Sequence, residues 1–328
     1  MKKALLFCII ILFSFLSTNA QEGNTVFNFL SYPVSARASA LGRTNISIIE
    51  NDVSLIYHNP ALLGPEMNMN VNLNYLFYIA DIGMGSATLA KAMGERSAWG
   101  VGFNYVDYGK MIRADKDGTI SGDLPAKDIC GNLFFSHDLT DRLRGGIAAK
   151  FVYSPYDQYT SIGLGVDLGL SYYNKDRQFS AGLVGKNLGR QIKAYDEETT
   201  EMPWEIQFGI SKGLEHAPIR FSFTAVNLNR WDYKNIQGDD QKFFTTLLDH
   251  FIFGLDFLPS DNLWIALGYN TRLGSDMKLQ QGNRMAGFSI GAGLNIKAFK
   301  IGCSLAQYHP SATSFMVSLT TSLSEVKL

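Results

Sequence analysis

The chain has few cysteines and little charge, and each shortage excludes a class of protein. Of its three cysteines among 328 residues, Cys8 lies in an apolar leader, which leaves Cys130 and Cys303. Two cysteines are too few for the disulfide framework that holds small secreted domains together. Charged residues make up 18% of the chain and the formal net charge is −1, so the clustered basic surface that nucleic-acid binding requires is missing. We therefore predict a chain that is stabilised by its secondary structure and binds no nucleic acid.

Residue patterns for catalysis and for metal binding are also scarce. No two of the five histidines stand at the spacing of metal ligands, and no cysteine pair accompanies them. Ser136, His137 and Asp138 are adjacent, but neighbouring side chains of a strand point to opposite faces, so these three cannot form a relay. We predict no catalytic residue, no metal ion and no cofactor, and a protein that is not an enzyme. A relay assembled from distant residues, as in an outer-membrane hydrolase, is the alternative.

Long apolar runs are confined to the start of the chain. Lys2 and Lys3 precede an apolar stretch from Ala4 to Leu16, and Thr18 to Ala20 form a small-residue cleavage site. This order is typical of a secretory signal peptide, so we predict that residues 1–20 are removed from the mature protein. No later stretch approaches the ~20 apolar residues that a membrane-spanning helix needs.

The mature chain does contain a regular alternation of apolar residues with small or polar ones. In residues 161–172 one set of positions is apolar and the other is glycine, serine or aspartate, and residues 288–296 repeat the pattern. Residues 70–77 show it again, with asparagines on the polar face. Because a strand points successive side chains to opposite faces, each segment has one wholly apolar face. Segments of about ten residues with an apolar outer face and a polar inner face are typical of outer-membrane barrels.

These segments predict an all-β fold, a 14-stranded antiparallel transmembrane β-barrel of the outer membrane that occupies residues 69–328. The count is even, as in bacterial single-chain barrels. Tight turns alternate with connections that are often long, which predicts short periplasmic turns, long external loops and both termini on the periplasmic side. The predicted strands are 69–80, 83–92, 97–108, 129–137, 143–154, 160–173, 178–188, 203–212, 218–228, 250–258, 262–271, 284–295, 298–308 and 312–322, and the long connections are 109–128, 189–202, 229–249 and 272–283.

The inner face of the predicted barrel carries glycines and a few charges. The glycine pairs Gly83–Gly85, Gly163–Gly165 and Gly291–Gly293 continue as strands without a following helix, so we interpret them as space for another chain segment rather than as nucleotide loops. Inward charges either set the selectivity of a pore or pair with charged residues of a plug. By register these inward charges are Lys150, Asp167, Glu205, Arg220 and Asp256.

Residues 21–68 precede the barrel and are too polar for lipid and too long for a linker. Their run of small residues from Ala36 to Gly42 favours close backbone packing. A bore of fourteen strands is wider than its own side chains fill. We therefore predict that this segment folds into the lumen as a plug, or hatch, with Arg37, Arg43 and Asp52 as candidate partners of the inward charges.

Three short motifs in this segment resemble the start of a known family. They are Arg-Ala-x-Ala-Leu-Gly from Arg37 to Gly42, Asp-Val-Ser-x-Ile-Tyr from Asp52, and Asn-Pro-Ala-x-Leu, which begins with Asn59 and Pro60. The pattern resembles the PorV/PorQ family of fourteen-stranded barrels, which are related to the FadL long-chain fatty-acid transporters. The residues that follow and the modest length are most similar to the PorQ branch, which belongs to the type IX secretion system.

The resemblance implies a non-enzymatic role in protein secretion at the cell outer membrane. It implies that the barrel anchors the cell-surface attachment complex, holding a PorZ-like surface protein beside PorU and PorV while cargo is fixed to lipopolysaccharide. The alternative is a FadL-like transporter that passes hydrophobic small molecules through a lateral opening. A transporter predicts an apolar ligand pocket behind the hatch and a bulge in an early strand. An anchor predicts a filled lumen and an exposed apolar patch on the loops.

The connection 229–249 is the candidate surface for a partner. Exposed aromatic side chains beside charges are typical of binding hot spots. A compatible alternative is a short helix from Gln241 to Asp249 that caps the pore. The candidate binding residues of this connection are Trp231, Tyr233, Phe243 and Phe244.

Overall fold

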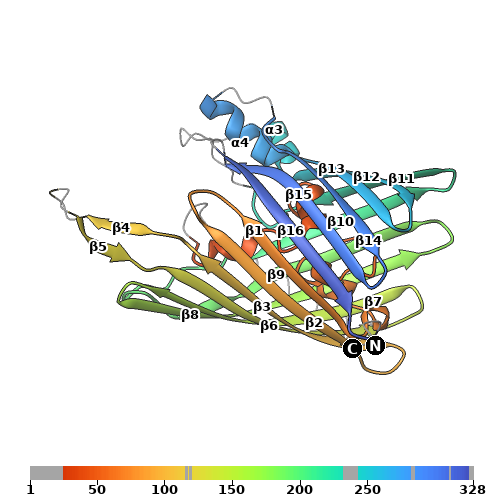
Figure 1. Ribbon diagram of the computed structural model, residues 1–328, viewed down its shortest axis with the longest axis horizontal. Coiled ribbons are helices and arrows are strands. Elements are labelled where there is room, and N and C mark those ends of the chain that lie inside the picture. The colour runs from red at the N-terminus through yellow and green to blue at the C-terminus, as the bar shows by residue number, and fades with distance from the viewer. Residues whose placement is uncertain are drawn as a thin grey trace.

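The fold is a closed antiparallel barrel of fourteen strands (Figure 1). The computed structural model describes residues 25–114, 117, 120–231, 243–281, 285–309 and 312–324, so the predicted signal peptide lies outside the described residues. In barrel order the strands are β1 (Asn70–Phe77), β2 (Gly83–Ala92), β3 (Ser97–Asp107), β6 (Lys127–Asp138), β7 (Leu143–Tyr156), β8 (Tyr159–Asn174), β9 (Phe179–Lys193), β10 (Glu205–Leu214), β11 (Ala217–Ala225), β12 (Phe251–Ser260), β13 (Leu263–Asn270), β14 (Phe288–Ile296), β15 (Phe299–His309) and β16 (Ala312–Ser322). The sheet closes because β1 pairs with β16 as well as with β2, and this confirms the predicted fold class.

Most barrel strands turn an apolar face outward and a mainly small or polar face inward. In β8, Leu164, Leu168 and Leu170 are exposed on the outside, whereas Gly165 and Asp167 are buried. The same division holds in β1 and β14, as the alternation predicts. In lipid this arrangement places apolar side chains against acyl chains while every strand pairs its backbone groups with both neighbours.

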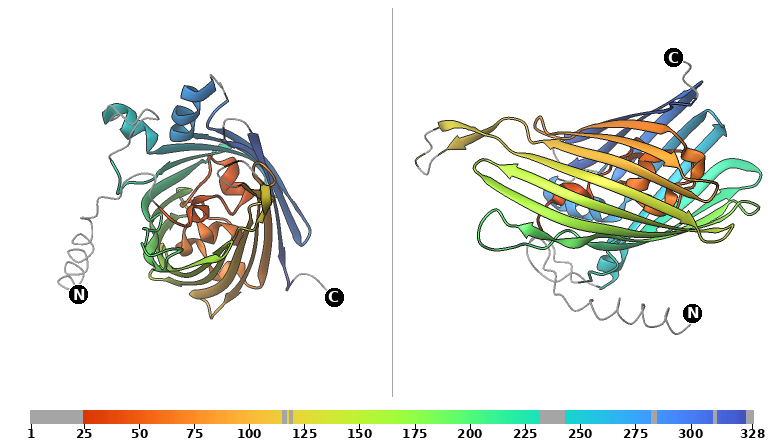
Figure 2. Two further views of the ribbon diagram at one scale, coloured as in Figure 1. Left: turned by 90° about the vertical axis from the view of Figure 1, so that its left-hand side faces the viewer. Right: turned by 90° about the horizontal axis from the view of Figure 1, so that it is seen from below.

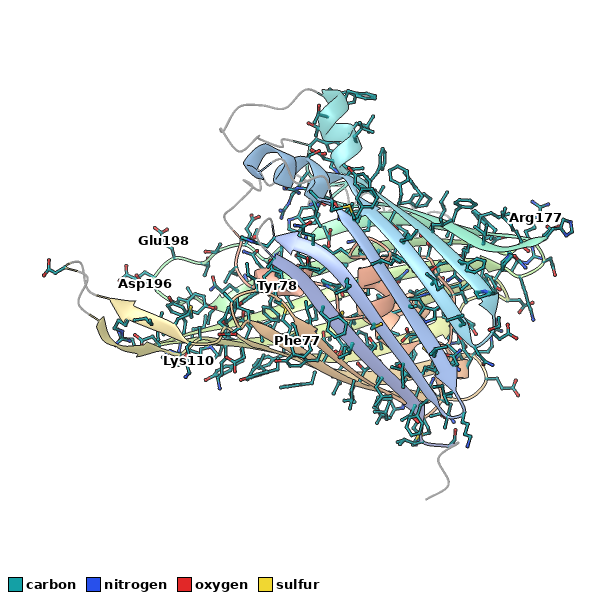
Figure 3. All side chains as sticks on the ribbon, turned by 45° about the horizontal axis from the view of Figure 1, so that its top comes forward. Phe77, Tyr78, Lys110, Arg177, Asp196 and Glu198 are labelled. Carbon is teal, nitrogen blue, oxygen red and sulfur yellow. The ribbon has the colours of Figure 1, made fainter. Side chains whose placement is uncertain are left out.

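Every connection at one end of the barrel is a tight turn, and the long connections lie at the other end, as predicted. Asp196 and Glu198 lie in the connection after β9, and Arg177 lies in the turn before β9, at the opposite end of the molecule (Figure 3). We call these the loop end and the turn end. Because β-barrels of bacteria have short periplasmic turns and long external loops, the loop end is the predicted external face.

The long connections contain secondary structure that the sequence pattern did not predict in full. The ribbon β4 (Met111–Ala114) and β5 (Ile120–Leu124) extends from the loop end, and its strands are too short to reveal a period of two. Helix α4 (Thr271–Gln281) is weakly amphipathic and lies where the sequence pattern predicts only a long connection. The predicted short helix is present as α3 (Phe243–Asp249), and α3 and α4 lie beside the mouth of the barrel rather than across it (Figure 2), which does not favour pore capping. No helix in the described ranges is long and apolar enough to cross a membrane.

Residues 25–68, which we call the interior segment, lie inside the barrel (Figure 2). Thr25 pairs with Glu201 at the loop end, whereas Met69 accepts a hydrogen bond from Leu323 N at the turn end. The described chain therefore starts and ends at opposite ends of the barrel, which differs from the expectation of both termini on one side, because the segment traverses the lumen before β1 begins. Its short helices are η1 (Asn28–Ser31), α2 (Ala36–Ala40), η2 (Val53–Tyr57), η3 (Pro60–Leu62) and η4 (Pro65–Met67).

Glycines on the inner wall make room for the interior segment, with one exception to the prediction. A Cβ on Gly163 would lie 2.5 Å from the Phe27 ring, and the pair that includes Gly291 also faces inward. The prediction is wrong for Gly83 and Gly85, which lie on the outer face beside Tyr75. Small residues occupy both faces of β2, so its alternation does not reveal which face is inward.

We expect a membrane-impermeant maleimide to label Asp196→Cys on intact cells and to leave Lys175→Cys unlabelled, because the long connections should face outward. Both variants would carry Cys130→Ser and Cys303→Ser to remove the native thiols, and both should react once the cells are lysed. Labelling of Lys175→Cys on intact cells, with none at Asp196→Cys, would invert the orientation.

Candidate functional site

The small residues around α2 allow the interior segment to contact the wall directly. Ala36 N donates to Ser318 Oγ of β16 at 3.0 Å. Gly42 has a φ of +93°, a conformation that favours glycine, and its N–H donates to Ser289 Oγ at 2.9 Å. A Cβ on Gly42 would lie 2.5 Å from Ile252 Cγ2. The motif that carries the family resemblance is therefore an interface between the segment and the barrel.

The other two motifs begin short 3₁₀ turns. Asp52 Oδ1 accepts a hydrogen bond from the backbone N–H two residues later at 2.9 Å. Asn59 Oδ1 accepts from Ala61 N at 3.0 Å, and Asn59 Nδ2 donates to Leu170 O of β8 at 3.2 Å. Pro60 stands at the first position of η3, where a missing N–H is tolerated. These side chains fix the turns and tie one of them to the wall.

Four charged side chains join the interior segment to β11 and β12. Arg37 Nη2 lies 2.9 Å from Glu50 Oε1 and 3.1 Å from Asp256 Oδ1, the second contact being an ion pair without hydrogen-bond alignment. Arg220 Nε lies 2.9 Å from Asp256 Oδ2, and Arg220 also pairs with Glu50. The Arg37 side chain is 1% exposed, and its guanidinium carbon lies 4.3 Å from the centre of the Trp264 ring. The cluster is neutral, and loss of one partner would leave a buried charge without compensation.

The guanidinium groups determine the protonation state of Glu50. Burial by itself raises the pKa of this carboxyl. The charges of Arg37 and Arg220 together lower the pKa by more than burial raises it, so that it falls to about 2 from an ordinary value of 4.5. Glu50 is therefore ionised at neutral pH, and the cluster keeps its charge balance.

The inward charges predicted from the register do face the lumen, but their partners differ. Lys150 Nζ lies 2.7 Å from Asp167 Oδ2, so these two pair with each other within the wall. Arg220 of β11 and Asp256 of β12 pair with each other and with the interior segment. Glu205 faces a cavity at the loop end. Of the candidate partners in the interior segment, Arg37 forms ion pairs. Arg43 and Asp52 form no ion pair within 4.0 Å with any residue that the structure describes.

The adjacent residues weighed for catalysis point to opposite faces, as expected. Ser136 Oγ is buried and donates to Leu63 O at 2.7 Å. His137 Nδ1 lies 2.8 Å from Ser97 Oγ on the exposed side. Among the described residues no group of three or more His, Cys, Asp or Glu side chains is placed to hold a metal ion. That the protein is not an enzyme stays a prediction.

Exposed apolar side chains gather at the loop end, on and before α3. The rings of Trp231 and Phe243 stack with their centroids 6.2 Å apart, and the two residues are 47% and 73% exposed. Phe244 is 69% exposed and Leu248 adds a further exposed side chain on α3. We call Trp231, Phe243, Phe244 and Leu248 the rim patch. Tyr233, the fourth predicted binding residue, lies outside the described residues, and Leu248 was missed because a single leucine in a connection carries no distinctive signal.

Comparison with known proteins identifies the fold. No protein-family model matches the chain, and no curated protein matches it. A solved deltaS2S3 mutant of the TodX monoaromatic hydrocarbon channel is 14% identical, with a TM-score of 0.54 over 88% of this chain and 99% of that chain. The Pseudomonas putida toluene transporter TodX is 13% identical (TM-score 0.49, 86% and 95% covered), and a Pseudomonas aeruginosa FadL homologue is 10% identical (TM-score 0.46, 93% and 100% covered). At these identities the likeness concerns the fold alone, which in this chain is a closed 14-stranded antiparallel barrel.

The contact between η3 and the wall should not tolerate an added methyl group. A Cβ on Gly146 would lie 2.3 Å from Ala61 N, so we expect Gly146→Ala to displace the turn and to speed hydrogen exchange of residues 59–63 in the purified protein. Gly131→Ala is the matched control, because a Cβ there meets nothing within 4 Å. Equal exchange rates in the two variants would mean that the turn is not held against the wall.

The stabilising contribution of Glu50 should persist well into the acid range. Its pKa in the folded protein is about 2, below the ordinary 4.5, so the contribution is fully present above about pH 4.5 and is lost as the pH falls through about 2. We expect Glu50→Gln to lower the thermal unfolding midpoint at pH 7, and the difference from the unmodified protein to disappear near pH 2. A difference that has already vanished at pH 4 would contradict the pairing with Arg37 and Arg220.

Proposed function

We propose that this protein is a non-enzymatic outer-membrane component of the type IX secretion system that anchors the cell-surface attachment complex through its external loops. The observation that carries the proposal is the combination of an occupied lumen with an exposed rim patch. An anchor needs a rigid barrel and a surface that binds a partner, and it needs no open passage. The five motif residues that suggest the family all have packing roles inside the barrel: Arg37, Gly42, Asp52, Asn59 and Pro60.

The interior supports a barrel that stays closed. The interior segment bonds to β16 and β14 through Ala36 and Gly42 and to β8 through Asn59, and buried ion pairs join it to β11 and β12. A transporter with a lateral opening is expected to have a bulge or break in an early strand. In this barrel β1, β2 and β3 pair in continuous register. Register shifts occur instead between β8 and β9 and near the ends of the pairs β10–β11, β12–β13 and β15–β16. These features favour an anchor over a passage.

The rim patch supports a protein partner at the cell surface. Large aromatic side chains offer much apolar area, and residues of this kind dominate the free energy of protein binding. We infer that the partner is a PorZ-like surface protein, held beside PorU and PorV where cargo is joined to lipopolysaccharide. The lipid bilayer surrounds the outer wall, the C-terminus is proposed to be periplasmic, and no cofactor takes part.

The second candidate is a FadL-like transporter of hydrophobic small molecules. The solved barrel with the same fold is described as a monoaromatic hydrocarbon channel, and fold likeness by itself favours this candidate over a role in secretion. A shared fold hosts unrelated functions, however. The cavity between the interior segment and the wall at the loop end has charged and amide residues in its lining, among them Arg43, Lys186 and Gln207, which suits a hydrophobic ligand poorly.

We expect Trp231→Ala combined with Phe243→Ala to abolish co-purification of the surface partner from outer membranes. Truncation of a hot-spot residue costs about 2 kcal/mol or more, roughly thirtyfold in affinity, whereas the barrel wall is untouched and heat-modifiable migration on gels should stay normal. The matched control is Tyr173→Ala combined with Phe299→Ala, which removes exposed aromatic side chains at the turn end.

Full retention of the partner by the rim variant, at normal abundance, would contradict the proposal. If cells that lack the protein also fail to take up toluene or a fatty acid, and the unmodified gene restores uptake, the transporter candidate replaces it.

A further inference from the structure

A polar cavity of about 390 Å³ lies at the loop end between the interior segment and the wall formed by β9 to β13. Its lining includes Arg43 and His58 from the interior segment, Lys186 from β9, and Glu205 and Gln207 from β10. The volume corresponds to about a dozen water molecules at ~30 Å³ each and is within the range of small-molecule sites.

Positive charge exceeds negative charge around this cavity. Arg272 and Asp276 of α4 lie 3.7 Å apart and compensate each other. Three further cations, Arg43, Lys186 and Arg230, remain against the single carboxylate Glu205. None of the three has an ion pair within 4.0 Å in the part of the chain that the structure describes. The Lys186 side chain is 5% exposed, a costly position for a cation without a bonded anion.

Several buried polar atoms around the cavity also have no hydrogen-bond partner among the described residues. They are His58 Nε2, Gln207 Oε1, and Nε and Nη2 of Arg230. His58 and Gln207 are each 2% exposed, and the opposite ring nitrogen of His58 is 3.0 Å from Thr44 Oγ1. Buried polar groups in folded proteins are nearly always bonded, so unbonded polar atoms on several residues that line one cavity indicate a site for polar groups from outside the chain.

We propose that this cavity binds a small anion that also carries hydroxyl groups, such as a hexuronate. The guanidinium groups and the ammonium group donate to a carboxylate or phosphate, which they bind through charge-assisted hydrogen bonds. Gln207 Oε1 is an acceptor and requires a donor, which a hydroxyl group supplies. A fatty-acyl chain or an unsubstituted aromatic ring would leave these atoms without partners. The site is independent of the rim patch and does not rest on a role in secretion.

Calorimetric titration of the full mature chain in detergent tests the site with three probes. We expect glucuronate to bind with an affinity that falls as sodium chloride is raised, because the attraction is electrostatic. Glucose lacks the charge and hexanoate lacks the hydroxyl groups, so each should bind about tenfold or more weakly than glucuronate.

Variants locate the binding. Lys186→Met should weaken glucuronate binding about tenfold or more, and Arg230→Gln, in the connection after β11, gives a second variant that leaves the strands unchanged. Gln207→Met should reduce the preference for glucuronate over hexanoate. Lys212→Met is the matched control, because Lys212 lies near the turn end of β10, away from the cavity.

Three results would overturn the proposal. They are the absence of glucuronate binding at millimolar concentration, equal or tighter binding of hexanoate, and an equal loss of affinity in the Lys212→Met control. Because the rim variant is tested by co-purification and this site by titration, failure of one leaves the other standing.

Discussion

A sheet that spans a membrane must pair every backbone group within itself, and this requirement organises the whole molecule. Closure of β1 onto β16 removes the sheet edges. A barrel of this strand number encloses more space than its own side chains fill. The chain fills that space with residues 25–68, and small wall residues such as Gly146 and Gly291 let the backbone of the segment approach the strands. The wall and its contents are therefore complementary surfaces that depend on each other.

Charge inside the barrel is arranged differently at the two ends. At the turn end Arg37, Glu50, Arg220 and Asp256 form a neutral cluster in which each side chain has an oppositely charged partner. Such a cluster holds two segments in one arrangement, because any displacement leaves a buried charge uncompensated. At the loop end cations exceed anions around a polar cavity. The first arrangement is structural, whereas the second suits recognition of a ligand.

The external surface and the interior point to different kinds of interaction. The rim patch is apolar, aromatic and exposed, which are properties of a protein-binding surface. The cavity at the loop end is polar and charged. The fold is compatible with channels and with anchors alike, so the proposed function rests on the rim patch, the occupied lumen and the motif resemblance rather than on the barrel.

The sequence by itself determined the barrel, the strands and the inward or outward side of most of their residues, because the period of two is a local property of each strand. It also indicated that residues 21–68 belong inside, since small and polar residues there suit neither lipid nor a linker. The tertiary structure decided which charges meet: Glu50 and Arg220 are 170 residues apart, and no local pattern links them. The tertiary structure also decided that Gly83 and Gly85 face outward. The sequence could not show this, because small residues on both faces of β2 hide which face is inward. The cavity around Lys186 and Gln207 likewise depends on how far the interior segment fills the lumen, which is a matter of packing between distant parts of the chain.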